Sequence, residues 1–348
     1  MADDRNQTPT EAGFSMPPEW GPHAACLMAW PARRELWKDR LAEAKRDYAA
    51  VARAISDFEP VVMICNPGDD REVRDLCGDQ VEALRIPIDD SWVRDSGPIF
   101  VCDAAGRVGV VKFGFNAWGE RWHPYDQDAR VPEAVAAHLG MRLFSAPLVL
   151  EGGSIFVDGE GTAITTEQCL LNPNRNPTLN RVQIEQALMD YLGVTTVVWL
   201  KHGHSLDVGP EGTDGHVDGV AQYVGPGRLF LETPADPKAS EFLRSRQNLS
   251  ILGSVCDARG RSFTVSRFDP GPEATVSYAN FYLANGGVIV PTSGGAADSD
   301  ALGFIRAVFP EREVVGVPGM TLAFGGGGPH CITQQIPTGD PVTMPQSK

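Results

Sequence analysis

A cysteine near the C-terminal end of the chain is the first candidate for chemistry. Cys331 follows four consecutive glycines, Gly325 to Gly328, in the stretch GGGGPHC. Glycine destabilises helices and strands, so such a run is expected where the backbone bends sharply or approaches another group closely. A cysteine at that point could be a nucleophile, a metal ligand or a small buried apolar side chain.

A histidine-rich and acidic stretch is the second candidate. The segment HGHSLDVGPEGTDGHVDG, residues 202–219, contains His202, His204, His216 and Asp218. These four side chains could bind a metal ion, but neither a CxxC nor an HExxH motif accompanies them and the glycine-rich spacing is a loose frame for ligands. The pattern favours His216 as a general acid and base beside the carboxylate of Asp218, and we predict no metal site.

Two further carboxylates stand in distinctive surroundings. Asp95 lies in DDSWVRDSGP (89–98), where Trp92 could form a wall for a flat cation and carboxylates could bind a guanidinium through two hydrogen bonds. Glu151 follows the apolar residues 147–150, so it is expected to be partly buried and to need a partner. Taken singly, the segment of Asp95 is better explained by a solvated turn and Glu151 by a structural salt bridge.

The combination is more informative than its parts. A cysteine, a histidine and three carboxylates exceed what a cysteine protease needs, and the surplus of acids fits a cationic substrate. The chain of 348 residues carries a net charge of −15, which argues against nucleic acid or an anionic membrane as the main partner. We therefore expect a small cationic ligand.

The remaining composition indicates a reduced cytoplasmic protein. The first residues lack the basic and apolar regions of a signal peptide, and no apolar run is long enough to span a membrane. The cysteines are odd in number and show no CxxC spacing, so the six others are expected to be structural thiols. They are Cys26, Cys65, Cys77, Cys102, Cys169 and Cys256.

Helical and strand patterns alternate along the chain, which predicts an α/β fold. Residues 1–15 are expected to form a flexible arm, and the absence of a linker predicts one catalytic domain over 16–340. The expected helices are 38–58, 131–139, 179–192, 237–252 and 298–308, and the expected strands include 61–64, 108–113, 195–199 and 286–290.

A weak internal repeat suggests how the candidate residues meet. Residues 94–111, 150–165 and 216–232 each have an acidic residue (Asp95, Glu151 or Asp218) within their first three positions, followed by a strand, a glycine-containing turn and another strand. Residues 280–292 resemble them with Asn280 at the head. Such units indicate blades around a centre. Asp95, Glu151 and Asp218 would then lie at equivalent strand ends and converge, although amphipathic hairpins can also resemble one another by chance.

The sequence as a whole resembles the agmatine deiminases, a family in the peptidylarginine-deiminase-like group of guanidine-modifying enzymes. The matching stretches occur in order over nearly the whole chain, and together they are highly specific. They are MPPEWGPHAACLMAWP (16–31), DDSWVRDSGP (89–98), FNAWG (115–119), LEGGSIFVDGEGTAITTEQCLLNPNRNP (150–177), DGHVDG (214–219), NFYLANGG (280–287) and GGGPHCITQQ (326–335).

The resemblance implies a pentein-like, five-bladed α/β propeller with pseudo-fivefold symmetry. It also implies a hydrolase of linear amidines that converts agmatine to N-carbamoylputrescine and ammonia, with no metal or organic cofactor, in putrescine biosynthesis. A homo-oligomer is implied in the same way.

Site residues follow from the same motifs. The resemblance makes Cys331 the nucleophile of an amidino-cysteine intermediate and His216 the acid and base. Glu151 supports the histidine, and Asp95 and Asp218 grip the guanidinium. Two carboxylates can fix a planar cation for attack, and the attacking sulfur must be a thiolate.

The substrate stays open at this level. Trp92 is expected to line the pocket and Glu211 to contact the far end of the substrate, but the loop 202–213 is longer than expected for an agmatine deiminase. Another guanidino compound (arginine, peptidyl-arginine or a longer guanidino amine) and an amidinotransferase are the alternatives. Free arginine would need a cationic partner for its carboxylate, and Arg94, Arg175 and Lys201 are candidates.

Overall fold

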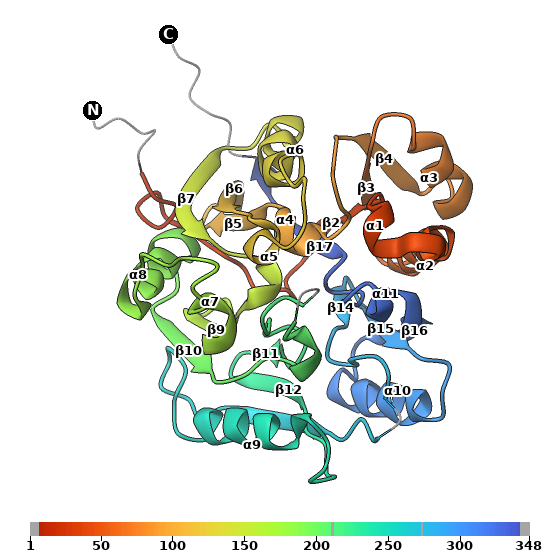
Figure 1. Cartoon of the computed structure of the whole chain (residues 1–348). Helices are drawn as coiled ribbons and strands as arrows, with labels where there is room; N and C mark the ends of the chain where they lie inside the picture. Colours follow the sequence, from red (N-terminus) through yellow and green to blue (C-terminus); the bar gives the residue numbers. More distant parts are fainter. Residues whose placement is uncertain (1–6, 210–211, 273, 342–348) are drawn as a thin grey trace.

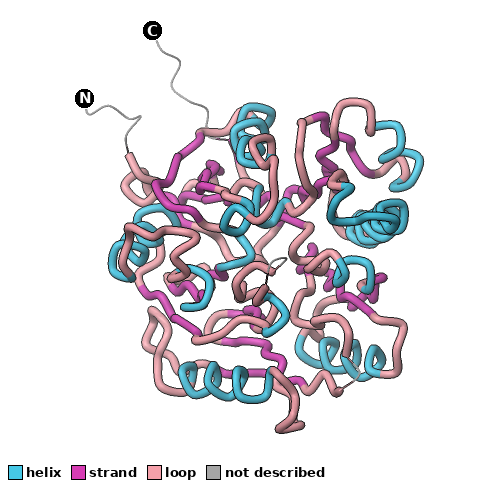
Figure 2. The backbone as a smooth tube through the Cα atoms, viewed as in Figure 1, coloured by secondary structure: helices cyan, strands magenta, loops and turns pink. Residues whose placement is uncertain are grey.

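Five separate sheets surround a common centre in the computed structural model of the chain (Figure 1). The structure describes residues 7–209, 212–272 and 274–341. The long helices lie at the periphery and the strands lie further in, as the tube coloured by secondary structure also shows (Figure 2). This arrangement confirms the α/β propeller that the alternating pattern and the resemblance predicted.

Each sheet repeats one plan. An inner strand pairs antiparallel with a middle strand, a helix follows, and an outer strand pairs parallel with the middle one. The first sheet consists of β17 (Thr333–Pro337), β2 (His23–Ala29), β3 (Val61–Cys65) and β4 (Val81–Arg85), with α2 (Leu41–Ser56) and α3 (Asp70–Cys77). The second consists of β5 (Ile99–Asp103), β6 (Arg107–Gly114) and β7 (Leu143–Val149), with α6 (Val131–Leu139) and the short edge strands β1 (Phe14–Ser15) and β18 (Asp340–Pro341).

The other three sheets have three strands each. They are β8 (Ile155–Val157), β9 (Thr162–Thr166) and β10 (Thr196–Leu200) with α8 (Arg181–Leu192); β11 (Ala221–Gly225), β12 (Arg228–Glu232) and β13 (Thr264–Phe268) with α9 (Glu241–Leu252); and β14 (Tyr282–Ala284), β15 (Gly287–Thr292) and β16 (Glu313–Pro318) with α10 (Ala297–Val308). The expected helices and strands therefore form, with shifts of a few residues at their ends.

The predicted repeats are the hairpins of four blades. β5–β6, β8–β9, β11–β12 and β14–β15 are antiparallel pairs, and each inner strand is preceded by its head residue, Asp95, Glu151, Asp218 or Asn280. The fifth inner strand, β17, comes from the far end of the chain and pairs with β2. Cys331 precedes β17 by two residues and so occupies the fifth head position, which the sequence repeat did not reveal.

Helix α8 shows how local sequence defines these elements. Asn180 and Gln183 form a reciprocal capping box at its start, and Gly193 ends it in the left-handed conformation with φ of +70°. One face carries Ile184, Leu188 and Leu192 into the core of the second and third blades. Burial of such side chains stabilises the fold by about 1.5–3 kcal/mol each.

The N-terminal segment differs from its expectation. Phe14 is buried in β1, which pairs with β5, and its ring lies 5.7 Å from that of Phe144. The Thr10 amide also donates a hydrogen bond to the Asp190 carbonyl at the end of α8. The prediction of a flexible arm over 1–15 is therefore wrong for residues 7–15, because Phe14 buries its ring against the second blade. Residues 1–6 lie outside the described part of the chain.

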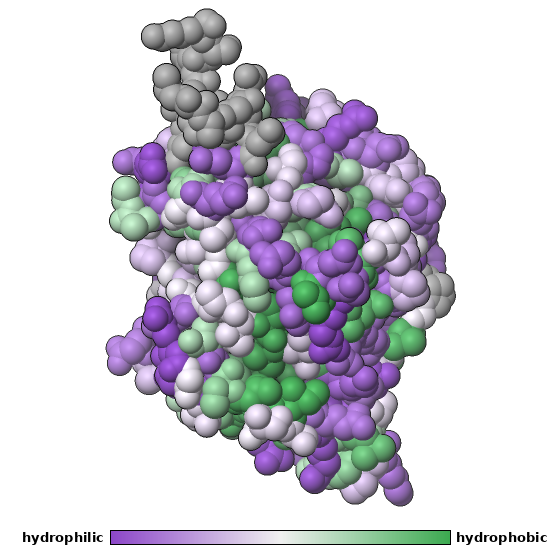
Figure 3. Space-filling view, turned by 90° about the vertical axis from the view of Figure 1, so that its left-hand side faces the viewer, coloured by the Kyte–Doolittle hydropathy of each residue, from purple (hydrophilic) through white to green (hydrophobic). Residues whose placement is uncertain are grey.

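Within the described residues, no helix combines the length and the apolar character that a bilayer span requires. Figure 3 shows that apolar residues gather on the lower half of the side that faces left in Figure 1, with hydrophilic residues around them.

Candidate active site

Three of the predicted side chains converge on one glycine. A Cβ atom placed on Gly153 would lie 2.7 Å from His216 Nδ1, and 2.9 Å from both Asp218 Oδ2 and Asp95 Oδ1. The Gly153 amide donates to Asp95 Oδ1 over 2.9 Å, and Trp118 Nε1 donates to the other oxygen over 2.9 Å. The EGG motif thus supplies a position without a side chain at which heads of different blades meet.

Cys331 lies beside this cluster. Its Sγ is 3.3 Å from Asp218 Oδ2, and the Asn280 side-chain amide donates to the sulfur over 3.2 Å. Burial raises the pKa of the thiol well above its usual value, and Asp218 and Asp95 raise it further, whereas the Gly328 amide and Asn280 act in the opposite direction. In the absence of a bound cation, the sulfur therefore favours the protonated form.

The glycine run before Cys331 is packed too tightly for side chains. Gly326 has φ of +100°, a conformation that favours glycine. The other three glycines lie close to neighbouring side chains, as the sequence predicted. A Cβ would lie 2.4 Å from the Trp37 ring at Gly325, 2.6 Å from the Trp92 ring and 2.9 Å from Cys331 Cβ at Gly327, and 2.6 Å from Asn280 Oδ1 at Gly328.

His216 lies between two carboxylates, and neither of its ring nitrogens makes a hydrogen bond to a residue in the described part of the chain. Nε2 is 3.7 Å from Glu151 Oε2 and Nδ1 is 3.8 Å from Asp95 Oδ1. Burial alone would lower the pKa of His216, but Asp95, Cys169 and Glu151 outweigh burial and raise the pKa well above its usual value. The ring is therefore suited to hold a proton and to release it to a group that enters between these carboxylates.

Arg175 connects Glu151 to the loop that carries His216. Its Nε donates to Glu151 Oε1 over 2.6 Å, and its Nη1 donates to Asp214 Oδ2 over 2.8 Å. Burial alone would raise the pKa of Glu151, but Arg175 and His216 outweigh it and lower the pKa to about 2. Asp214 and Gly215, with φ of 64° and 90°, form the tight turn that delivers the imidazole.

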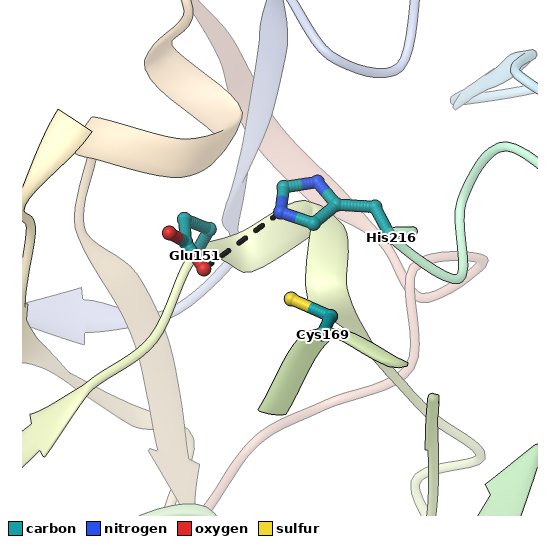
Figure 4. A group of neighbouring side chains, drawn as sticks. All are labelled: Glu151, Cys169 and His216. Atoms are coloured by element: carbon teal, nitrogen blue, oxygen red, sulfur yellow. Dashed lines mark ion pairs between the residues drawn. The ribbon is translucent and has the colours of Figure 1, made fainter. Parts of the chain in front are cut away.

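A possible metal-binding group occurs within the site. Glu151, Cys169 and His216 each offer a ligand atom, and these atoms lie within 4.8 Å of one another (Figure 4). The four metal ligands considered from the sequence, His202, His204, His216 and Asp218, do not form such a group among the described residues. His202 contacts Gln247 instead, and His204 lies 3.9 Å from Glu241. The group in Figure 4 could hold a soft divalent ion only in place of the proton on the imidazole.

A cavity of about 820 Å³ leads from the surface to Cys331 and Asp218. Six carboxylate residues line its described part, namely Asp207, Asp218, Glu232, Asp236, Glu241 and Asp269, together with one lysine, Lys238. Burial raises the pKa of Asp207 to about 7; His216 acts to lower it, and Asp218 and Glu241 act to raise it further. This lining favours a ligand that carries more than one positive charge.

Two predicted binding residues have different outcomes. Trp92 is buried and stacks on Trp37, with 5.8 Å between the ring centroids, and it is not among the lining residues of the cavity. Its indole supports the glycine run beside Cys331, so its place differs from the expected pocket wall. Glu211 lies outside the described residues, although its neighbours Gly212 and Thr213 line the cavity.

The cations considered as partners for a substrate carboxylate are already paired. Arg94 binds Glu19 over 2.9 Å and Arg175 binds Glu151, with all four side chains buried. Lys201 lies on the surface and pairs with Glu167. None of the three is among the lining residues of the cavity.

Sequence reasoning missed several residues that hold the site together. Glu19 and His330 form a buried pair behind Asp218, with 3.1 Å between His330 Nε2 and either oxygen of Glu19. Cys169, at the start of α7 (Glu167–Leu170), was assigned only a structural role, yet its sulfur points to His216 (Figure 4). Glu19, Cys169 and His330 lie in the matching stretches 16–31, 150–177 and 326–335, but the sequence did not show which residues they contact.

The chain matches a known protein family and curated sequences over most of its length. The family model for Porphyromonas-type peptidyl-arginine deiminases matches residues 15–337. Among curated sequences, the agmatine deiminase of Pseudomonas aeruginosa (strain UCBPP-PA14) is 40% identical over 361 aligned positions, which cover 95% of this chain and 97% of the relative.

Solved structures give the same result. A structure of the agmatine deiminase of Enterococcus faecalis has 34% identity and a TM-score of 0.90, and the match covers 96% of this chain and 98% of the other. A substrate-bound agmatine deiminase variant of C. jejuni has 26% identity and a TM-score of 0.84, with 94% of this chain and 97% of the other covered.

Proposed function

The chain belongs to the Porphyromonas-type peptidyl-arginine deiminase family, among the agmatine deiminases, and from this we propose that it hydrolyses agmatine to N-carbamoylputrescine and ammonia. The reaction would proceed through a covalent amidino-cysteine at Cys331. One observation carries the proposal: Cys331 and Asp218 line a cavity rich in carboxylates, and Asp218 meets Asp95 and His216 at Gly153.

Binding of the guanidinium is the first step. Asp95 and Asp218 accept hydrogen bonds from its N–H groups and hold its plane beside Cys331. The cation also offsets the negative charges that keep the pKa of the thiol high, so the thiol releases its proton to solvent when substrate binds. Substrate and thiolate therefore stabilise each other.

Formation of the covalent intermediate follows. The thiolate attacks the guanidinium carbon, a C–S bond forms, and a neutral tetrahedral adduct results. The C–N bond to a terminal nitrogen then breaks, and His216 gives that nitrogen a proton so that it leaves as ammonia. Glu151 keeps the imidazole oriented and favours its protonated form.

Hydrolysis returns the enzyme to its starting state. His216, now neutral, takes a proton from water while the oxygen attacks the thiouronium carbon. The C–S bond breaks, and the remaining hydroxyl proton of the product passes to the departing sulfur, which restores the protonated thiol of the free enzyme. The ureido group of the product is neutral, so the charge that held the substrate between the two carboxylates is gone before the product leaves.

The cavity supports agmatine rather than arginine. Agmatine carries a second cation at its far end, and Asp207, Glu232 and Glu241 line the same cavity as Asp218. Arginine would place a carboxylate there, with Lys238 as the one lysine or arginine of the described lining. The proposal includes a contact of Glu211 with the far amine, a single domain over 16–340, a homo-oligomer in the cytoplasm and catalysis without metal or organic cofactor.

Ammonia release from a substrate panel tests the function. The panel holds agmatine, arginine, a peptidyl-arginine and longer guanidino amines, each with the wild type and Cys331→Ala. We expect Cys331-dependent release that is far faster with agmatine than with the others. Faster release from another member would assign that substrate instead, transfer of the amidine to added amine would indicate an amidinotransferase, and no release from any member would overturn the deiminase.

A further inference from the structure

A line of four buried charged side chains lies behind the nucleophile. Arg94 Nη1 donates to Glu19 Oε1 over 2.9 Å, His330 Nε2 lies 3.1 Å from both Glu19 oxygens, and His330 Nδ1 lies 2.9 Å from Asp218 Oδ2. All four side chains are buried, and His330 is fully so. The line ends at the same Asp218 oxygen that accepts the Cys331 thiol.

The geometry around His330 defines its protonation. Each ring nitrogen lies within hydrogen-bond distance of a carboxylate oxygen, and carboxylates only accept hydrogen bonds. A neutral imidazole has one N–H, so its other nitrogen would present a lone pair to an anion. Both contacts are favourable only when both nitrogens carry protons, which makes His330 an imidazolium.

Charges near His330 come from few elements. Glu19 precedes β2, Asp218 precedes β11 and Arg94 lies in α4 (Val93–Ser96), with its Nε donating to the His330 carbonyl over 3.2 Å. Phe156 of β8 packs on the ring at 5.0 Å between centroids. Arg94 and the burial act to lower the pKa of His330, and Glu19 and Asp218 outweigh them.

We propose that His330 is a positioning residue whose fixed positive charge, held by Glu19, keeps Asp218 ionised and lets Asp218 and Cys331 be deprotonated together. Catalysis at a guanidinium needs both anions at once, because Asp218 must grip the cation while Cys331 attacks it. Two anions 3.3 Å apart repel each other strongly, and a cation on the far side of Asp218 reduces that cost.

The inference rests on the proposed function only for the use of the thiolate, and it can be tested without turnover. Peptide mass spectrometry reports the rate at which iodoacetamide alkylates Cys331 as a function of pH. In His330→Asn the new amide can still donate to Asp218, and in His330→Gln it can still donate to Glu19, but neither variant carries the charge. We expect the pH of half-maximal alkylation to rise by about one unit in both variants.

A matched control separates charge from packing. His23 is also buried, its Nδ1 lies 3.1 Å from Glu59 and its Nε2 donates to the Glu19 carbonyl over 2.9 Å. Its ring makes no hydrogen bond to Asp218 or Cys331. His23→Asn should leave the half-point unchanged. An unchanged half-point in both His330 variants, or an equal shift in His23→Asn, would overturn the proposal.

The two failures are distinguishable. A protein that releases no ammonia but shows the predicted alkylation shift would lose the proposed function and keep the role of His330. An active deiminase whose pH of half-maximal alkylation is the same in the wild type and the His330 variants would support the proposed function and overturn the role of His330.

Discussion

Two parts of the cavity lining are built in different ways, one from the heads of the blades and one from the segments between the blade strands. At the reaction end, Cys331, Asp218 and Asn280 stand at heads of blades, and each is held by hydrogen bonds to the others. The other part, which we call the entrance end, is formed by segments between the blade strands: Asp207 belongs to the short helix η5 (Ser205–Asp207), and Asp236 and Asp269 lie on connecting loops. The former is positioned by the shared architecture of the five sheets, whereas the latter depends on individual loops.

This difference separates chemistry from selectivity. The reaction end recognises only the guanidinium and the atoms that react, and it would serve any guanidino compound. The entrance end contacts the remainder of the substrate, so the choice between agmatine and a related compound depends on a few loop carboxylates. Substitutions at the reaction end should therefore lower kcat, and substitutions at the entrance end should raise KM.

The largest expected effect concerns the nucleophile. Cys331→Ser should lower kcat by more than about 10⁴-fold, because a serine hydroxyl is a far weaker nucleophile without a base to deprotonate it. Ammonia release and the mass of a quenched adduct measure the loss. Cys256→Ser, at an exposed cysteine, should keep full activity, and comparable losses in both variants would contradict the assignment.

Loss of the acid and base should come next. His216→Asn should lower kcat by about 10²- to 10⁴-fold, because proton transfer to the leaving nitrogen and from water is lost. Glu151 stays paired with Arg175 in this variant, so the fold should persist, which circular dichroism checks. A variant that retains wild-type kcat at neutral pH would remove His216 from the mechanism.

A smaller loss should follow from a methyl group placed beside the sulfur. Gly327→Ala would bring a Cβ within 3.0 Å of Cys331 Sγ and closer still to Trp92, so the nucleophile must shift. We expect kcat to fall by about 10- to 100-fold, because small misplacements of a nucleophile have effects of this size. Gly303→Ala in α10, where a Cβ meets nothing within 4 Å, is the matched control and should leave kcat intact.

The smallest effect is expected at the entrance end. Asp207→Asn should raise KM for agmatine by about tenfold, which corresponds to about 1.4 kcal/mol of lost attraction, and leave kcat nearly unchanged. The KM of a guanidine with an uncharged alkyl tail should not change. Equal losses for both substrates would place Asp207 at the reaction end instead.

The pH dependence of the same contact sharpens the comparison. Burial raises the pKa of Asp207 to about 7, so the free enzyme holds this carboxyl neutral below that pH and charged above it. Only the charged form attracts the far ammonium, so KM for agmatine should rise as pH falls below about 7. Asp207→Asn should flatten this dependence, and an unaltered slope would assign it to another group, such as Glu232, whose pKa burial also raises to about 7.

The sequence predicted the site best for the residues that belong to the internal repeat. Asp95, Glu151 and Asp218 could be predicted to converge because equivalent positions in a ring of blades face the same centre. His216 follows from Asp218, since the turn that carries one carries the other. The fifth head could not be found in this way, because β17 follows a glycine run instead of the acidic opening of the other repeats.

The sequence was least informative for ion pairs formed across the ring. Glu19 and His330 are 311 residues apart, and no local pattern shows that β17 returns to lie beside β2. Arg94 and Arg175 could be read as free cations for a substrate carboxylate, since only the folded chain shows them buried against Glu19 and Glu151. The entrance loops lack a repeat altogether, so their carboxylates could be counted but not placed.

The late position of β17 has a consequence for synthesis on the ribosome. The first blade lacks its inner strand until residues 333–337 have emerged, after the strands of the other blades have been made. Cys331 immediately precedes that strand, so the reactive thiol enters the molecule with the segment that closes the ring. A nascent or prematurely terminated chain that has not reached Cys331 therefore carries no nucleophile, and one that stops before β17 also leaves the pairing edge of β2 open to other chains.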